Sequence, residues 1–266
     1  MQVRGSAPVF WQQRGITAQT KITRSPELTT PAFMKHIYYM GENYCKALFL
    51  NLMSQKSHES LITESFERQM SSANLPFIRY EYFDFHEVVK GKNYEKVNGL
   101  INRLAFLNEK FAFFAQNLNN GTIIMNQNGI IRTNCLDCLD RTNVVMSKIG
   151  ISVFDLQLRL MTLNAVFYGM DLVALLDTAN NKTQHEFITN FKKIWADNGD
   201  VLSKHYSGTN SLISNVTRNG KGSFFGFFEH SVKSIERFYI SNFEDQVKQS
   251  CIDLVTGRHS DTANGR

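Results

Sequence analysis

The chain has few residues that break or cross-link structure, and it has no long apolar run. Its 266 residues include only four prolines and four cysteines, and no Pro-, Ser- or Gly-rich linker interrupts them. The lack of a linker favours one large domain over two. No segment holds 18 consecutive apolar residues, so we expect no part of the sequence to span a membrane.

The cysteines have neither regular spacing nor the context of a secreted protein. Cys45, Cys135, Cys138 and Cys251 follow no secretory signal, which favours a reducing, cytosolic compartment. Cys135 and Cys138 form a C-x-x-C pair, a pattern found in redox pairs and in zinc sites. Zinc needs two further ligands, and no second C-x-x-C or H-x-x-x-H exists, so we expect no metal and no cofactor. We interpret Cys45 and Cys251 as inert core thiols.

Charge constrains the partners only weakly. The chain has 29 Lys and Arg against 24 Asp and Glu, a net charge of +5, and 42% hydrophobic residues are enough to build a core. The small positive excess suits an anionic substrate or an anionic membrane face. An ordinary, slightly basic surface explains it equally well.

Apolar periodicity predicts strands that alternate with long helices. Strands are expected at 45–53 and 77–85, and helices at 58–70, 97–114, 150–177, 183–196 and 230–255. The apolar runs on both sides of Asn128 and Gly129 predict a hairpin over 122–131 with a tight primed turn. This order indicates an α/β fold with a mixed central sheet flanked by helices.

One short segment combines residues suited to phosphate chemistry. Cys135 is followed six positions later by Arg141 and then by Thr142, and the segment stands between a β-prone run and an apolar, helix-like stretch. A cysteine nucleophile works as its thiolate and needs positive potential, which N–H groups at a helix N-terminus provide. The planar fork of Arg141 matches two phosphate oxygens. The C-x5-R spacing therefore predicts a cysteine-phosphatase-like strand, phosphate loop and helix.

The segment 132–143 also resembles the signature of the Sac (suppressor-of-actin) phosphoinositide phosphatases, R-x-N-C-x-D-C-L-D-R-T-N, at every specified position. Further segments resemble other blocks of that family: 4–11 (R-G-S-x-P-x-F-W), 51–56, 82–91, 195–200 and 206–209. The resemblance covers about residues 2–257. A family tryptophan three positions before the R-G pair has no counterpart, because Met1 stands there. We therefore expect residues 1–255 to be the catalytic part of a Sac domain that lacks its amino-terminal subdomain, and residues 256–266 to be a polar, flexible tail.

The resemblance implies roles for individual residues. It implies Cys135, Asp137 and Arg141 as catalytic residues, with Asp137 a candidate general acid, and it implies a phosphate-binding loop of Leu136, Cys138, Leu139, Asp140, Arg141 and Thr142. Two carboxylates within such a loop would repel a phosphate unless one is protonated or turned away. Asp140 is expected to brace the loop instead, and Asp197 and Asp200 are alternative acids.

Several other residues have both a functional and a structural interpretation. His86 and His205 could face the substrate, although a structural role is favoured for both, and the Asn and Gly near His205 predict a loop. Arg4 and Trp11 are expected to anchor structure, and Arg4 could also help to hold the site together. The Phe224–Phe228 cluster could touch a membrane, but burial is favoured.

The resemblance implies a phosphoinositide phosphatase that removes ring phosphates from a membrane lipid through a phosphocysteine intermediate. It further implies peripheral contact with anionic membranes on the cytosolic face of endomembranes, and no nucleic-acid partner; protein partners are not predicted. A catalytically inactive lipid-binding or scaffold fragment is the alternative, and a phosphotyrosine phosphatase is a weaker one.

Overall fold

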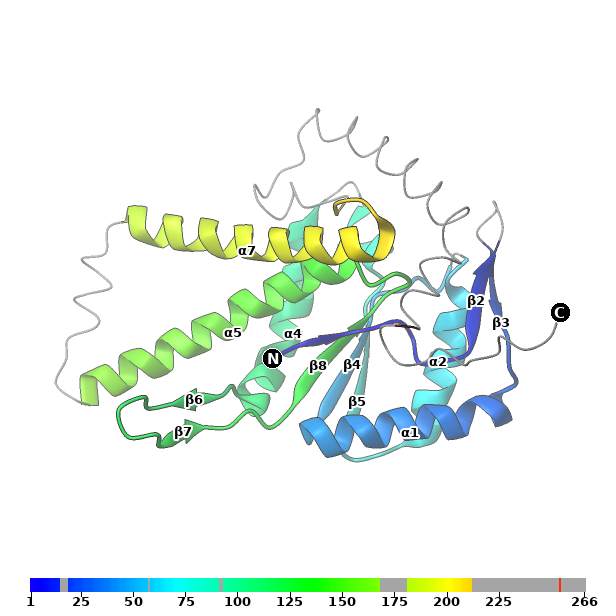
Figure 1. Ribbon diagram of the computed structural model, residues 1–266, viewed down its shortest axis with the longest axis horizontal. Coiled ribbons are helices and arrows are strands. Elements are labelled where there is room, and N and C mark those ends of the chain that lie inside the picture. Colours follow the sequence, from blue (N-terminus) through cyan, green and yellow to red (C-terminus); the bar gives the residue numbers. More distant parts are fainter. Residues whose placement is uncertain (15–18, 57, 91–92, 168–180, 212–253, 255–266) are drawn as a thin grey trace.

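Two short, fully buried strands form the centre of the sheet. The computed structural model describes residues 1–14, 19–56, 58–90, 93–167, 181–211 and 254 (Figure 1). Every residue of β4 (Ala47–Asn51) and β8 (Ile130–Asn134) is buried. Burial along a whole strand is typical of parallel strands that are covered on both faces.

The four strands of this sheet are all parallel. Their order is β1 (Val3–Arg4), β8, β4 and β5 (Ile78–Tyr82). Phe49 of β4 lies in register with Arg132 on one side and with Tyr80 on the other. The α/β fold with a central sheet flanked by helices is thus confirmed, but the expected mixed sheet is wrong, because every described pairing in this sheet is parallel. The antiparallel pairs in the described residues lie in two separate ribbons, β2 (Trp11–Arg14) with β3 (Gln19–Ile22) and β6 (Ala115–Gln116) with β7 (Ile123–Met125).

Alternate residues of the strands point to two hydrophobic layers. Ala47 and Phe49 face α1 (Pro26–Tyr44) and α2 (Ser60–Ala73), where Phe33 and Phe66 are fully buried. Leu48 and Leu50 face the opposite layer, which holds the apolar stripe of α4 (Asn98–Phe111) and the first turns of α5 (Asp140–Phe167). Figure 1 shows these helices on either side of the sheet. The described helices include none that is both long and apolar enough to cross a membrane.

The remaining described helices complete this second layer. The short α3 (Phe85–Val88) and the 3₁₀ turn η2 (Tyr94–Val97) follow β5, and α7 (Asn181–Ser207) packs along α5. The rings of Phe154 and Phe191 lie 6.2 Å apart between α5 and α7. The expected helix 230–255, the cluster Phe224–Phe228 and the tail 256–266 lie outside the described residues, apart from position 254.

The expected hairpin over 122–131 is wrong. β7 pairs with β6 instead, and the turn between them contains Gly121 at φ +70°, while Ile130 continues into the parallel sheet. Gly129 serves a different purpose, because a Cβ there would lie 2.4 Å from the ring of Phe111.

Two helix boundaries also differ from expectation. Helix α4 ends at Phe111, so Phe114 lies beyond its apolar stripe and is 57% exposed. The predicted loop around His205 is wrong, since α7 continues to Ser207 and the His205 ring nitrogen Nδ1 lies 2.8 Å from the carbonyl of Val201, one helical turn earlier.

Candidate active site

The carboxyl ends of the parallel strands bring the candidate residues to one edge of the sheet. Asn51 and Asn134 end β4 and β8 in register, and the Asn134 amide donates to Asn51 Oδ1 at 2.8 Å. Asn51 Oδ1 also accepts from the N–H of Met53, and the Asn51 amide donates to the hydroxyl of Tyr80. This network fixes the point where the chain leaves β8. In open parallel sheets, ligands bind at this edge.

The segment after β8 is a tight loop held by its own side chains. Cys138 has φ +58°, and its sulfur contacts both backbone polar groups of Cys135: it accepts from the N–H at 3.4 Å and donates to the carbonyl at 3.3 Å. Asp137 Oδ1 accepts from the N–H of Leu139 at 3.1 Å. Helix α5 then begins at Asp140, so its first N–H groups point back toward the loop. The predicted order of strand, loop and helix is confirmed.

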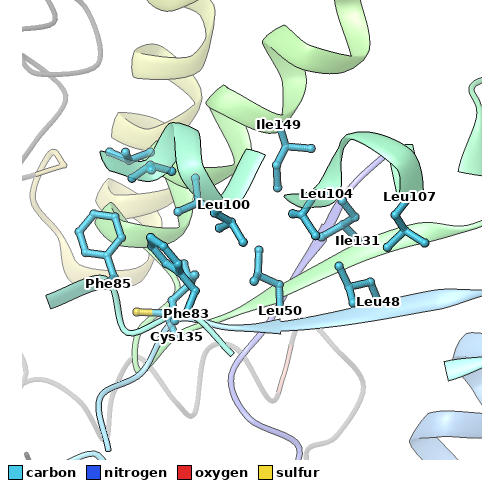
Figure 2. Close-up of a cluster of buried hydrophobic side chains, with 14 of the residues drawn as sticks. Leu48, Leu50, Phe83, Phe85, Leu100, Leu104, Leu107, Ile131, Cys135 and Ile149 are labelled. Carbon is cyan, nitrogen blue, oxygen red and sulfur yellow. The ribbon is translucent and has the colours of Figure 1, made fainter. Parts of the chain in front are cut away.

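The Cys135 thiol lies inside the protein. It is fully buried at one end of the layer formed by α4 and α5, and Figure 2 shows its sulfur beside Phe83. This burial raises the pKa of the Cys135 thiol above its ordinary value, and the charge of Arg141 opposes the shift. Burial likewise raises the pKa of Cys138 to about 11. Both thiols are therefore neutral near pH 7 in this arrangement of the loop.

Arg141 is held by a carboxylate that the sequence did not reveal. Its Nη1 and Nη2 atoms donate to Glu59 Oε2 and Oε1 at 3.0 and 2.5 Å, and the Glu59 side chain is 1% exposed. Although burial acts against ionisation, the hydrogen bonds and charge of Arg141 keep the pKa of Glu59 below its usual value. The Arg141 pKa is raised: burial acts to lower it, and the neighbouring acidic groups Cys135 and Glu59 outweigh burial. Together these shifts keep both partners charged at neutral pH.

Arg4 supports the loop from the edge strand β1. Its guanidinium donates to the carbonyl of Cys138 at 3.4 Å and to Asn143 Oδ1 at 3.0 Å. The Asn143 amide in turn donates to the carbonyl of Trp195 in α7 at 2.8 Å. Gly199 permits this approach, because a Cβ there would lie 2.6 Å from Asn143 Nδ2. The expectation that Arg4 anchors structure and helps to hold the site is consistent with these contacts.

The other loop residues also make defined contacts. Asp140 Oδ1 accepts from the hydroxyl of Ser211 at 2.5 Å, so it braces the loop through a side chain beyond α7. Asp200 Oδ1 accepts from the N–H of Ser211, which gives Asp200 a structural contact as well. Thr142 is fully buried, and its hydroxyl has no hydrogen-bond partner among the described residues. Asp137 is the exposed carboxylate of the loop.

The loop after β5 lines the same edge. Asp84 accepts from the Ser54 hydroxyl at 3.0 Å and from the N–H of Glu87 at 2.9 Å, which starts α3. His86 follows it, and its pKa is lowered by burial and by the charge of Arg141, while Glu59 acts in the opposite direction. The charges of Arg141 and Glu59 thus both influence the His86 side chain, whereas His205 is exposed on α7.

Arg132, the first residue of the signature segment, has a structural position. It is 4% exposed, donates to the carbonyl of Ser6 at 2.8 Å and lies 5.2 Å from the ring centre of Phe49. A Cβ at Gly5 would lie 2.9 Å from its Nη2 atom. The segments 4–11 and 132–143, which are far apart in the sequence, therefore interlock through Gly5 and Arg132.

Comparison with known proteins finds one matching family model and several similar phosphatases. Residues 1–90 match the family described as "SacI homology domain". The chain is 36% identical over 261 residues to inositol-1,4,5-trisphosphate 5-phosphatase 1 of Schizosaccharomyces pombe. The aligned region covers 97% of this chain and 22% of that protein. It is 34% identical over 262 residues to phosphatidylinositol-3-phosphatase SAC1 of Saccharomyces cerevisiae (97% and 40%), and 31% identical over 264 residues to phosphoinositide phosphatase SAC8 of Arabidopsis thaliana (98% and 42%).

The first 90 residues are thus similar to the SacI homology domain, and the similarity to Sac-type phosphatases extends over 97% of the chain. The chain spans between about a fifth and two fifths of the length of these relatives.

Proposed function

We propose that this chain is the catalytic part of a phosphoinositide phosphatase that hydrolyses phosphomonoesters on the inositol ring through a phosphocysteine intermediate. The observation that carries the proposal is the loop from Cys135 to Arg141 at the carboxyl end of a parallel sheet, with the helix N-terminus of α5 behind it. The names of the relatives support a phosphoinositide substrate. A lipid substrate would bring the protein to the cytosolic face of endomembranes as a peripheral protein.

In this mechanism the Cys135 thiolate attacks phosphorus, and the bond between phosphorus and the inositol oxygen breaks. Arg141 and the N–H groups of the loop stabilise the equatorial oxygens of the transferring phosphoryl group. Thr142 supplies a buried hydroxyl near the start of α5 that can donate to the sulfur. Water then attacks the phosphocysteine, which releases inorganic phosphate and restores the thiol.

The burial of Cys135 sets a requirement for turnover. A thiol with a raised pKa beside Phe83 can neither ionise readily nor contact a phosphate, so the loop must turn the sulfur toward the helix N-terminus when substrate binds. Hydrogen bonds of Cys138 and Asp137 to the loop backbone help to hold the loop in its described form. We propose that these bonds are exchanged for bonds to the phosphate.

The leaving alkoxide needs a proton, and Asp137 is the candidate donor. It is the exposed carboxylate of the loop, and its Oδ1 atom lies 4.0 Å from the Cys135 sulfur. Because Asp137 also accepts from Leu139, it would have to leave that bond to serve as an acid. Asp137→Asn should therefore flatten one limb of the pH profile, and should cost less with a substrate whose leaving group needs no proton.

A binding-only or scaffold role is the second candidate, and the buried, neutral Cys135 is the observation that favours it. In that case the chain would bind phosphoinositides without releasing phosphate.

The decisive experiment measures phosphate release from short-chain phosphoinositides phosphorylated at each ring position, because the relatives are named for different positions. Soluble inositol phosphates and phosphotyrosine peptides serve as competing substrate classes, and Cys135→Ser is the control without a nucleophile. Turnover that survives EDTA, with phosphate label trapped on Cys135, supports the proposal. Lipid binding without phosphate release from any member of the panel would favour the binding role, and recovery only with added magnesium would overturn the cysteine mechanism.

A further inference from the structure

The Arg141 guanidinium has two edges that can bind an oxyanion, and Glu59 occupies one of them. A guanidinium carries five N–H groups in a rigid plane. Glu59 accepts one N–H from Nη1 and one from Nη2, so it occupies the Nη1/Nη2 edge at the tip of the guanidinium. The adjacent edge, formed by Nε–H and the second N–H of Nη2, is turned away from Glu59. Within the part of the chain that the structure describes, Nε donates no hydrogen bond to a protein group.

Glu59 is itself held firmly. Its Oε2 atom accepts from the N–H of Ser54 at 2.9 Å, and its residue position immediately precedes α2. The hydroxyl of Thr63 donates to the carbonyl of Ser54, and Ser54 Oγ donates to Asp84. The carboxylate does not cap the helix that it precedes, since its oxygens are used by Arg141 and Ser54. A rigid carboxylate is thus directed at Arg141 from the loop after β4.

The energetics of this pair argue for a role beyond stability. Replacing a buried ion pair by packed apolar side chains is often neutral or stabilising, so such a pair contributes little to stability on its own. What it does provide is direction, since a bidentate Arg–carboxylate contact fixes the plane of the guanidinium. A fixed guanidinium loses less conformational entropy when it binds the transition state.

We infer that Glu59 is a positioning residue for phosphoryl transfer: it fixes the Nη1/Nη2 edge of Arg141 so that the Nε/Nη2 edge faces the phosphate loop. This inference rests on the proposed phosphatase function and names a residue from a different segment of the chain, 82 positions away from Arg141.

The test compares Glu59→Gln with Glu64→Gln. Both variants remove one carboxylate charge from the same region, but Glu64 is an exposed residue of α2, whereas Glu59 is buried against Arg141. A glutamine at 59 presents N–H groups to the donors of Arg141 or Ser54, so it cannot match the fork. We expect Glu59→Gln to lower kcat by about 10- to 100-fold with KM changed by less than about 3-fold. Glu64→Gln should behave as wild type, and Glu59→Asp should recover part of the loss.

A double-mutant cycle separates positioning from a merely structural effect. In an Arg141→Lys background the fork is already lost, so adding Glu59→Gln should cost less than about 3-fold in kcat. A structural role would give the same factor in both backgrounds, and additivity would overturn the inference.

Orthovanadate binding by titration calorimetry gives a readout that needs no turnover. We expect Glu59→Gln to weaken vanadate binding by about 10-fold, and Glu64→Gln to leave it unchanged. If the wild-type protein hydrolyses no substrate, the proposed function fails. The vanadate affinities of the variants still test whether Glu59 positions Arg141 for binding an oxyanion. The inference is overturned if Glu59→Gln equals wild type in vanadate affinity, or if its kcat rises, which would show that Glu59 competes with phosphate. Should Glu59→Gln not fold, unchanged vanadate affinity in Glu59→Asp is the overturning result.

Discussion

Gly199 offers a sharp test of how α7 supports the site. Replacing a helical glycine by alanine ordinarily stabilises a helix by about 0.5–1 kcal/mol. At Gly199 the new methyl would lie 2.6 Å from Asn143 Nδ2 and 3.0 Å from its Cγ atom. Asn143 cannot swing aside freely, because its amide group is bonded to Trp195 on one side and to Arg4 on the other.

The magnitude follows from setting these two effects against each other. Overpacking in a well-packed site costs about 1–3 kcal/mol, which exceeds the gain in helix propensity. We expect Gly199→Ala to lower the free energy of unfolding by about 1 kcal/mol. Because the displaced Asn143 would release Arg4 and the carbonyl of Cys138, kcat should also fall a few-fold.

Gly99→Ala is the matched control, since Gly99 also lies in a helix but has no atom within 4 Å of its would-be Cβ. That variant should be more stable than wild type by about 0.5 kcal/mol. Urea unfolding followed by circular dichroism, under identical buffer conditions, measures both changes. If the two alanine variants shift stability in the same direction by similar amounts, the contact between α7 and Asn143 is misjudged.

Three further predictions concern the loop and the layer beneath it. Cys135→Ser should abolish phosphate release, while Cys138→Ser should keep most of it, because a hydroxyl can replace the contacts of the Cys138 thiol to Cys135. Assays of phosphate release and of trapped phosphate label test both variants. Label found on Cys138 would contradict the assignment of Cys135 as the nucleophile. Arg141→Lys should lower kcat by at least ~10²-fold, and unchanged kcat in a folded variant would count against the phosphate loop. Burial, followed by the charge of Arg132, lowers the pKa of His36 from 6.5 to about 4, so the unfolded chain takes up this proton first as the pH falls. The resulting contribution to stability is complete above about pH 6.5 and is lost as the pH falls from 6.5 to 4. Urea unfolding of wild type and His36→Gln at pH 7 and 4.5 checks this, and parallel losses in both proteins would refute it.

The sequence predicted the parts of the fold that depend on local patterns. The apolar run that became β4 and the periodic stripe of α4 were located within a few residues. The order of strand, loop and helix around Cys135 was also predicted, because it depends on one continuous segment of the sequence.

The two clear errors have one physical cause. Gly129 and Gly199 both indicated turns, yet neither has a positive φ, and each instead makes room for a side chain from a distant segment. Glu59 was missed for a related reason. Its partner is 82 residues away, and nothing local distinguishes it from the other acidic residues of the chain. Long-range packing decides all three cases.

The position of β1 has a consequence for how the protein acquires its structure during synthesis. Among the described residues Val3 and Arg4 pair with Arg132 and Thr133, so this strand has no partner in the sheet until about 130 further residues have been made. At the usual rates of translation this delay amounts to roughly ten seconds. Contacts of such large sequence separation also slow folding, because their loop-closure entropy is lost before they form. A nascent chain that stops short of Asn134 therefore holds Arg4 without the loop that it contacts, and the candidate site can form only after β8 has been made.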